Sequence, residues 1–328
     1  MTGSLRYRLQ SAKRSLYYRF GLERFLFDSP PSKNLVLMFH NVVPVADPML
    51  NPRNISLADF SFILDFIQRN FEVVSLETML ANSSKTGKIA ITFDDGLINN
   101  LHYAASELAR RKMPATYFIS TPLIHGREIL WPDELSFLLK HTGNEVSFHN
   151  KKFVRTYRSH FRDAVSGKKL EDELLESPQQ EIDDLISSLR SNIKLQGIFH
   201  KENEDLWRVM KGEEIRLLAE IPGMRVGCHT ITHRNMVNLS DDEVREELLE
   251  SRKYLAFAIS ADVSMLAWPF GKYNARVGSV AQNAGFITQV GVTLNPAGEH
   301  NADVPFRLGV YNELRASEYC HQINSLLR

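Results

Sequence analysis

The sequence has few of the features that mark exported, membrane-spanning or disulfide-stabilised proteins. It contains two cysteines in 328 residues, Cys228 and Cys320, which are too few for a disulfide framework and lack the spacing of a zinc knuckle. No stretch approaches the roughly 20 apolar residues that cross a bilayer, and the N-terminus lacks the apolar core of a secretory signal. Lysine and arginine together number 39, as do aspartate and glutamate, so no net charge favours nucleic acid as a partner. We therefore expect a cytoplasmic protein that does not bind nucleic acid.

The composition predicts a large α/β domain. Apolar residues make up 43% of the chain and charged residues 24%, which is enough for a packed core. Short apolar runs alternate with helical patterns, which predicts a parallel sheet, and about seven such strands suggest a barrel. Several runs are apolar throughout, as expected for strands covered on both faces. The predicted strands are Leu35–Phe39, Ile89–Phe93, Ala115–Ile119, Arg225–Cys228, Met265–Trp268, Ile287–Val292 and Arg307–Val310.

Two helices have clear start signals, and one segment interrupts the alternation. Ser56 precedes a helical pattern, and Ser240 with Glu243 forms a capping box ahead of another. Between about 140 and 215 the sequence is rich in charge and helical in pattern, above all at 170–195, with no clear strand. We interpret this stretch as a mostly helical insertion within a single domain that spans residues 33–328.

The first 32 residues form a basic amphipathic segment. Apolar residues recur at helical spacing, and only two acids accompany the cations in the first 30 residues. One interpretation is a helix whose residues 1–28 contact an anionic membrane face. The other is a helix that caps the domain with its cations in water. The apolar residues are Leu5, Leu9, Ala12, Leu16 and Phe20, and the cations are Arg6, Arg8, Lys13, Arg14, Arg19 and Arg24.

A pair of carboxylates follows the second predicted strand. Asp94 and Asp95 are adjacent, and Gly96 permits the sharp turn that such a pair requires. Two carboxylates this close would raise the pKa of one of them. A cation bound by one removes the conflict and leaves the other as a base. The alternative is an Asp-Asp-Gly turn that caps the next helix.

A pair of histidines follows the fourth predicted strand in the same manner. His229 and His233 are four residues apart and can converge on one zinc ion. A helical zinc-protease motif requires Glu after the first histidine, but this position holds Thr230. Two histidines and one carboxylate also suit non-haem iron oxygenases, although a second carboxylate fits hydrolysis better. The remaining alternative is two unrelated surface histidines.

The carboxylate pair and the histidine pair are followed by a third motif, Ala267-Trp268-Pro269-Phe270-Gly271. In this order the three resemble the motifs of the polysaccharide deacetylases, also called NodB-homology or family 4 carbohydrate esterases. The resemblance spans roughly residues 33–310. It implies a distorted (β/α)7 barrel and metal-dependent removal of acyl groups, usually acetyl groups from N-acetylhexosamine units. Similar surroundings are Leu37-Met38-Phe39-His40, Pro114–Phe118 and Pro305–Leu308.

The resemblance also implies roles for individual residues. Asp94 is the general base, and the backbone N–H of Phe270 is the oxyanion donor. A divalent metal, with Zn²⁺ as the first choice, is held by Asp95, His229 and His233. Three aromatic residues are further predicted to contact substrate, although the first also fits a helix start; they are Trp131, Trp268 and Tyr273.

Two departures from the family pattern affect the proton transfers. The third motif often opens with an arginine that pairs with the base, whereas this chain has Ala267. We expect Arg307, at the end of the last strand, to orient Asp94 instead. Many members also carry a late Leu-x-His that protonates the leaving amine, and no such string follows Arg307. His40 is our candidate for that acid or for substrate binding, the alternative being a core histidine bonded to backbone.

The predicted function is removal of N-acetyl groups from amino-sugar units of a bacterial-type polysaccharide or lipid-linked glycan. Such a reaction belongs to exopolysaccharide or cell-envelope biosynthesis, on the cytosolic side and with residues 1–28 near the inner membrane face. Two alternatives stay open. One is a deformylase or another non-peptide amide hydrolase of the same fold, and the other is a glycan-binding pseudoenzyme.

Overall fold

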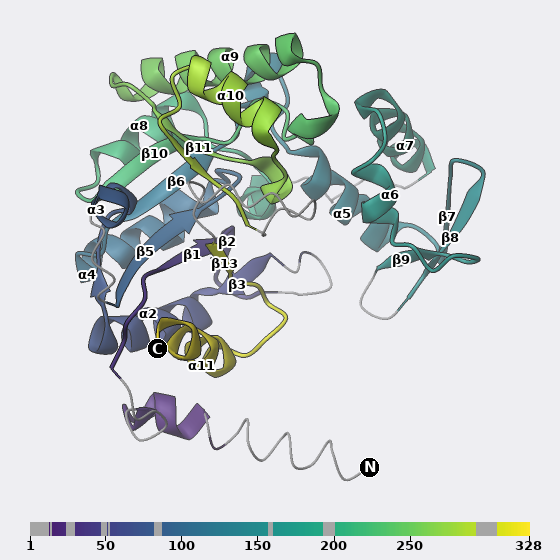
Figure 1. Ribbon diagram of the computed structural model, residues 1–328. Helices are drawn as coiled ribbons and strands as arrows, with labels where there is room; N and C mark the ends of the chain where they lie inside the picture. The colour runs from purple at the N-terminus through teal and green to yellow at the C-terminus, as the bar shows by residue number, and fades with distance from the viewer. Residues whose placement is uncertain are drawn as a thin grey trace.

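Parallel strands form a nearly closed barrel with helices around it (Figure 1). The computed structural model describes residues 13, 15–23, 30–46, 51, 53–81, 87–156, 160–192, 201–292 and 307–328. All seven predicted strands are confirmed, with ends that differ by at most two residues. In spatial order they are β12 (Thr288–Val290), β11 (Met265–Ala267), β10 (Met224–Cys228), β6 (Ala115–Ile119), β5 (Lys88–Phe93), β1 (Leu35–Phe39) and β13 (Arg307–Gly309).

Helices follow most of the strands and cover the outside of the barrel. Both predicted helix starts are confirmed, because the Ser56 hydroxyl accepts from the Asp59 amide and Ser240 forms a capping box with Glu243. The helices are α2 (Leu57–Asn70), α3 (Leu76–Ala81), α4 (Ser106–Arg111), α5 (Trp131–His141), α8 (Gly212–Glu220), α9 (Asp241–Ile259), α10 (Ala275–Asn283) and α11 (Ala316–Leu327). Short strands β2 (Asn41–Val43) and β3 (Asn54–Ser56) pair with each other, and β4 (Glu72–Val73) pairs with β5.

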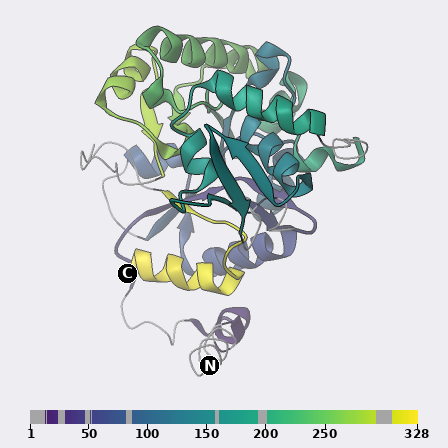
Figure 2. The same cartoon turned by 90° about the vertical axis from the view of Figure 1, so that its right-hand side faces the viewer.

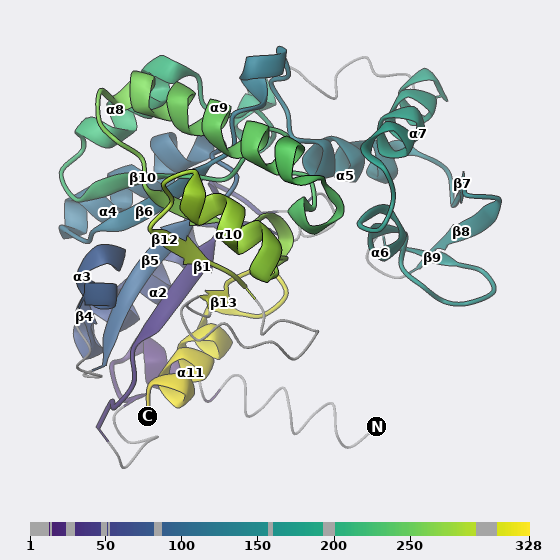
Figure 3. The ribbon, with the colours of Figure 1, turned by 45° about the horizontal axis from the view of Figure 1, so that its top comes forward.

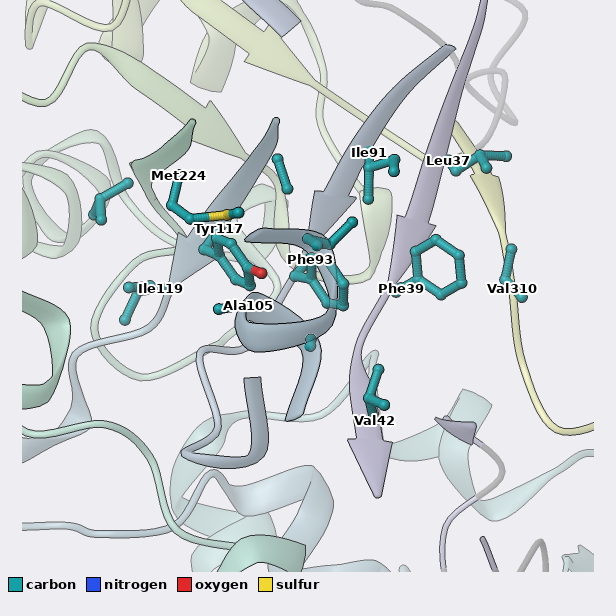
Figure 4. Close-up of a cluster of buried hydrophobic side chains, with 14 of the residues drawn as sticks. Leu37, Phe39, Val42, Ile91, Phe93, Ala105, Tyr117, Ile119, Met224 and Val310 are labelled. Atoms are coloured by element: carbon teal, nitrogen blue, oxygen red, sulfur yellow. The ribbon is translucent and has the colours of Figure 1, made fainter. Parts of the chain in front are cut away.

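The main core lies between the sheet and these helices. Alternate residues of β1, β5 and β6 point outward, and Phe39, Phe93 and Tyr117 stack in a row, with ring centroids 5.4 and 4.7 Å apart (Figure 4). The residues between them point to the opposite face, toward the barrel interior. A smaller apolar cluster there includes Val36, Ala90, Phe118, Met265, Ala267 and Val290. These side chains fill part of the barrel interior.

The barrel has one open seam, between β12 and β13 at the two ends of the sheet. These strands share no ladder within the described residues. The Arg307 side chain spans the seam, since its Nε donates to the carbonyl of Gly291, directly after β12, at 3.1 Å. Arg307 is the first residue of β13 rather than its last, which corrects the position expected from the sequence. Its guanidinium lies inside the barrel, 5.4 Å from the Phe118 ring centroid.

The insertion leaves the barrel after α5 and projects to one side (Figure 3), so that it faces the viewer in Figure 2. It contains helices, as expected, namely α6 (Leu170–Leu174) and α7 (Gln179–Asn192). The expectation that it lacks strands is wrong, because β7 (Glu145–Phe148), β8 (Lys151–Arg155) and β9 (Phe161–Asp163) form an antiparallel sheet. Charged side chains alternate with buried Val146, Phe148 and Phe153 there, so the strands carry a weak hydrophobic signal. The insertion has its own apolar core.

Only part of the basic N-terminal segment lies within the described residues, which exclude 1–12, 14 and 24–29. Residues 15–19 are helical and pack against the domain through Tyr18, whose ring meets Phe66 edge-on at 5.1 Å. The Tyr18 hydroxyl lies 3.2 Å from Nδ1 of His321 on α11. No helix in the described part of the chain is long and apolar enough to cross a membrane.

Candidate functional site

Asp94 and Asp95 occupy a tight turn at the carboxyl end of β5. The backbone amide of Asp94 donates to the carbonyl of Phe39 on the neighbouring strand at 3.0 Å, and the amide of Gly96 donates back to the carbonyl of Asp94, also at 3.0 Å. Asp95 and Gly96 both have positive φ, at 74° and 78°. A Cβ at Gly96 would lie 2.6 Å from Cγ2 of Ile119, so the turn needs glycine for space as well as for conformation.

Asp95, His229 and His233 converge on one buried point. Oδ1 of Asp95 lies 3.6 Å from Nε2 of His229 and 3.2 Å from Nε2 of His233. One ligand atom from each residue can be chosen so that all three lie within 4.8 Å of one another. All three side chains are buried. The sequence-predicted ligands are therefore brought together at the carboxyl ends of β5 and β10, where parallel barrels place reactive side chains.

The surroundings orient both imidazoles toward Asp95. Nδ1 of His229 lies 2.8 Å from the carbonyl of Ala267, so this nitrogen carries the proton and Nε2 keeps its lone pair. His233 is held through its backbone, whose carbonyl accepts from Nε1 of Trp131 at 3.0 Å. Burial lowers the pKa of His233, which keeps the ring neutral. Both rings therefore present the form of imidazole that binds a metal.

The donor set fits a divalent metal such as zinc. Two neutral imidazoles and one carboxylate are the ligands of many zinc sites with an open position. Oδ1 of Asp95 is buried and accepts no hydrogen bond within the described structure. A buried carboxylate oxygen without a donor is unfavourable unless a cation satisfies it. The nearest polar atoms to this oxygen are the two imidazole Nε2 atoms, an arrangement that a shared cation would satisfy.

Asp94 has a different environment from its neighbour. Its Oδ1 and Oδ2 each accept from Arg307, at 2.7 Å from Nη1 and Nη2 respectively. Burial alone would raise the pKa of Asp94, but Arg307 and the nearby His229 lower it below its ordinary value. Asp94 is therefore a carboxylate in a fixed orientation. It still has lone pairs for a further proton, because a carboxylate offers about four acceptor positions.

The third motif forms one wall of the site. Phe270 has φ 57°, and its ring packs on His233 at 4.5 Å and on Trp131 at 5.8 Å. Trp131 begins α5 and is 6% exposed, while Trp268 is fully buried in the main core. Each tryptophan therefore presents little surface to a substrate. Tyr273 is half-buried and stacks on Trp268.

His40 lies at the carboxyl end of β1, near the two aspartates. Burial lowers its pKa to about 4, so the ring is uncharged at neutral pH. Its Nδ1 is buried and makes no hydrogen bond within the described structure, unlike a core histidine bonded to backbone. The ring of Tyr311 lies 5.7 Å away. His40 is thus suited to donate or accept a hydrogen bond, and less suited to act as an imidazolium acid.

Two neighbours of the predicted ligands were not expected from the sequence. Arg53, just before β3, donates from Nη1 to Oδ2 of Asp95 at 3.0 Å. Glu247 on α9 accepts from the amides of Ile231 and Thr232, between the two histidines, at 2.8 and 3.0 Å. Arg53 lies in no motif and gives no signal in the sequence. The position of Glu247 within an amphipathic helix, at a buried site, is a signal that helical spacing could have revealed.

Backbone strain also gathers at this site. Four of the eight non-glycine residues with positive φ in the described chain lie in the three motif loops. They are Asp95, Thr230, His233 and Phe270. Such conformations persist where the surrounding structure enforces them, and they cluster at functional sites.

The family model for polysaccharide deacetylase matches residues 81–288, which is more than half of the chain and includes all three motifs. The chain belongs to the polysaccharide deacetylase family. A search of the curated proteins found no match. His40, Arg53 and Arg307 lie outside the matched residues.

Solved structures, two of them named as deacetylases, share the fold of this family member. IcaB from Ammonifex degensii is 14% identical, with a TM-score of 0.57, and the match covers 90% of this chain and 98% of that one. BC0361, a polysaccharide deacetylase from Bacillus cereus, is 15% identical with a TM-score of 0.54, and the match covers 89% of this chain and 69% of that one. The deacetylase PplD from Streptococcus pyogenes, in complex with acetate, is 15% identical with a TM-score of 0.52, and the match covers 89% of this chain and 99% of that one. At these identities the likeness shows the fold alone.

Proposed function

We propose that this chain uses a divalent metal to hydrolyse N-acetyl groups on amino-sugar units of a polysaccharide or lipid-linked glycan. One observation carries the proposal: the two adjacent carboxylates face different partners. Oδ1 of Asp95 faces His229 and His233, whereas both oxygens of Asp94 face Arg307. One carboxylate is thus available as a ligand and the other as a base.

The bound metal would polarise the amide carbonyl and acidify a water molecule. Asp94 accepts a proton from the attacking water, whose oxygen bonds to the carbonyl carbon as the carbon–nitrogen bond breaks. The backbone N–H of Phe270 donates to the developing oxyanion, and losing such a donor costs about 3 kcal/mol. His40, as a neutral ring, hydrogen-bonds the amide nitrogen. The nitrogen leaves with the proton that Asp94 accepted, and the amine then takes up the proton of the acetic acid. One water thus yields acetate and a protonated amine, so the glycan gains positive charge.

The test is acetate release from N-acetylglucosamine oligomers by metal-loaded protein, with metal content measured in parallel. Asp94→Asn should abolish turnover and retain metal, whereas Asp95→Ala should lose both. Glu246→Gln, at an exposed position on α9, is the control and should behave as wild type. Formate release from an N-formylated amino sugar, without acetate release from the N-acetyl oligomers, would identify a deformylase instead. Sugar binding without either product would identify a pseudoenzyme, and both results would refute the proposal.

We further propose that the N-terminal segment contacts the anionic face of a membrane, which would bring the site to a lipid-linked substrate. Leu16 and Phe20 lie one helical turn apart and are 55% and 69% exposed, whereas Tyr18 is fully buried against the domain. Residues two apart lie on opposite sides of a helix, so the apolar stripe faces away from the domain. Exposed Lys13 and Arg19 flank Leu16, as in helices that bind anionic lipid.

Flotation with vesicles tests this contact. Wild type should float with vesicles that contain phosphatidylglycerol and less with pure phosphatidylcholine, and salt should weaken the binding. The double variant Leu16→Glu with Phe20→Glu should stay with the soluble fraction. Val165→Glu, at a 96% exposed position on the insertion, is the matched control. Equal flotation of wild type and the double variant would refute the contact.

A further inference from the structure

The two oxygens of the proposed metal ligand Asp95 are not equivalent. Oδ1 faces the histidines and has no donor in the described structure, whereas Oδ2 accepts from Nη1 of Arg53 at 3.0 Å. Asp95 is fully buried, and the Arg53 side chain is 18% exposed. The ion pair is therefore largely shielded from water, where a charge interaction is stronger than at a surface.

Arg53 is itself fixed in place from two further sides. Its Nη2 donates to Oδ1 of Asp133 at 2.5 Å, and its backbone amide donates to Oδ1 of Asn51 at 2.9 Å. Asn51 in turn donates to the same oxygen of Asp133 at 2.8 Å. Asp133 follows Trp131 on α5 by two residues, and Trp131 holds the backbone of His233. The guanidinium fork thus has one orientation, which a planar group with several donors can maintain.

We propose that Arg53 is a positioning residue that makes Asp95 a single-oxygen ligand of reduced charge. This inference rests on the proposed metal-dependent function. With Oδ2 occupied by a cation, only Oδ1 is directed to the position shared with His229 and His233. The guanidinium also withdraws negative charge from the ligand. A metal with less charge donated to it remains a stronger Lewis acid, which favours the hydrolysis at the expense of metal affinity.

The proposal predicts that metal affinity and turnover change in opposite directions. In Arg53→Met the cation is lost, so Asp95 carries its full charge and both oxygens are free. We expect cobalt to bind about tenfold more tightly or better, an effect of the size that outer-shell changes produce. The visible absorbance per cobalt should fall as the second oxygen raises the coordination number, and kcat for acetate release should fall. A purely structural loss would weaken cobalt binding instead.

Cobalt titration followed by visible absorption, with acetate release on the same samples, tests this proposal. Arg53→Lys restores the cation and should return affinity and spectrum toward wild type. If Arg53→Met does not fold, Arg53→Gln, which removes the charge and keeps a donor, takes its place with the same expected result. Arg127→Met is the control, because Arg127 pairs with Glu134 and Asp183 and not with a ligand. Unchanged or weaker cobalt binding by Arg53→Met would overturn the proposal. If the proposed function alone fails, wild type still binds cobalt and shows the contrast with Arg53→Met, but it releases no acetate.

Discussion

Arg307 and Asp94 form a two-pronged ion pair inside the barrel, with both nitrogen–oxygen distances at 2.7 Å. The two residues lie 213 positions apart in the sequence, and both are buried. The same guanidinium donates to Gly291 across the open seam of the barrel. One side chain therefore orients the proposed base and joins the two end strands, so its replacement should affect both catalysis and stability.

Replacing Arg307 should move the acid limb of the pH–rate profile to higher pH. Arg307 lowers the pKa of Asp94 while burial raises it. In Arg307→Met burial still raises the pKa of Asp94, and only His229 and His40 are left to lower it. The pKa of Asp94 therefore rises, and the base becomes protonated at a pH where wild type is active. The measurement is kcat/KM for acetate release from pH 4 to 8. Arg307→Lys keeps a charge and should shift less, and an acid limb at the wild-type pH in Arg307→Met would contradict the prediction.

The Arg307 variants should also be less stable to unfolding than wild type. Breaking a buried ion pair by removing one partner typically costs about 3–5 kcal/mol. The pH profile therefore has to be measured below the unfolding temperature of each variant.

Replacing Glu247 should weaken metal binding without touching a ligand. Its carboxylate accepts from two successive amides in the loop between His229 and His233. Both amides donate to Oε2, which glutamine can keep as its carbonyl oxygen, whereas Oε1 accepts from Nη2 of Arg234 at 3.2 Å and becomes a donor in Glu247→Gln. The loop therefore loses part of its support, and the histidines lose their fixed orientation. We expect metal affinity to fall about 10- to 100-fold, as for other residues that orient ligands. A zinc competition assay against a chelating dye measures this, with Glu246→Gln on the same helix as control.

Gly96→Ala should destabilise the turn that carries the two aspartates. The residue has φ 78°, and an added Cβ would lie 3.1 Å from Cα of Ile119 as well as 2.6 Å from Cγ2. Left-handed conformation alone costs an L-residue about 1–2 kcal/mol, and the contact adds to this. Urea unfolding should show a lower midpoint than wild type. Gly143→Ala, where nothing lies within 4 Å of the added Cβ and φ is not positive, should show none of this loss.

The sequence predicted the strands of the barrel and the convergence of Asp95 with the two histidines, because both depend on local patterns. Buried parallel strands are continuous apolar runs, and reactive residues follow them directly. It could not predict Arg53, because that contact depends on where a loop folds over the barrel. The β7–β9 sheet was missed because its charged side chains hide the alternation. The donation of Arg53 to only one oxygen of Asp95 depends on side-chain orientation, for which one-dimensional spacing gives no signal.

Acid should weaken a further ion-pair cluster, on α4 and away from the site. Glu107 accepts from Arg110, Arg111 and Ser61, with distances of 2.8–3.1 Å. Hydrogen bonds from Arg110, with help from Arg111 and Ser61, lower the pKa of Glu107 from 4.5 to about 2, although partial burial acts against this. A carboxyl whose pKa is lower in the folded state stabilises the fold above its unfolded pKa. That stabilisation is lost as the pH falls toward the folded pKa.

The free energy of unfolding of wild type should therefore exceed that of Glu107→Gln at pH 6, by on the order of 1 kcal/mol for a pair near the surface. The difference should shrink between pH 4.5 and 2, because protonation removes the charge of Glu107 in wild type, whereas the variant has no charge at this position. Urea unfolding at several pH values measures it. Glu220→Gln is the control, since Glu220 is exposed on α8 and its oxygen lies 3.9 Å from Arg216. A difference between wild type and Glu107→Gln that stays constant over this range would show that the carboxylate charge contributes nothing there, and that only the shape of the side chain matters.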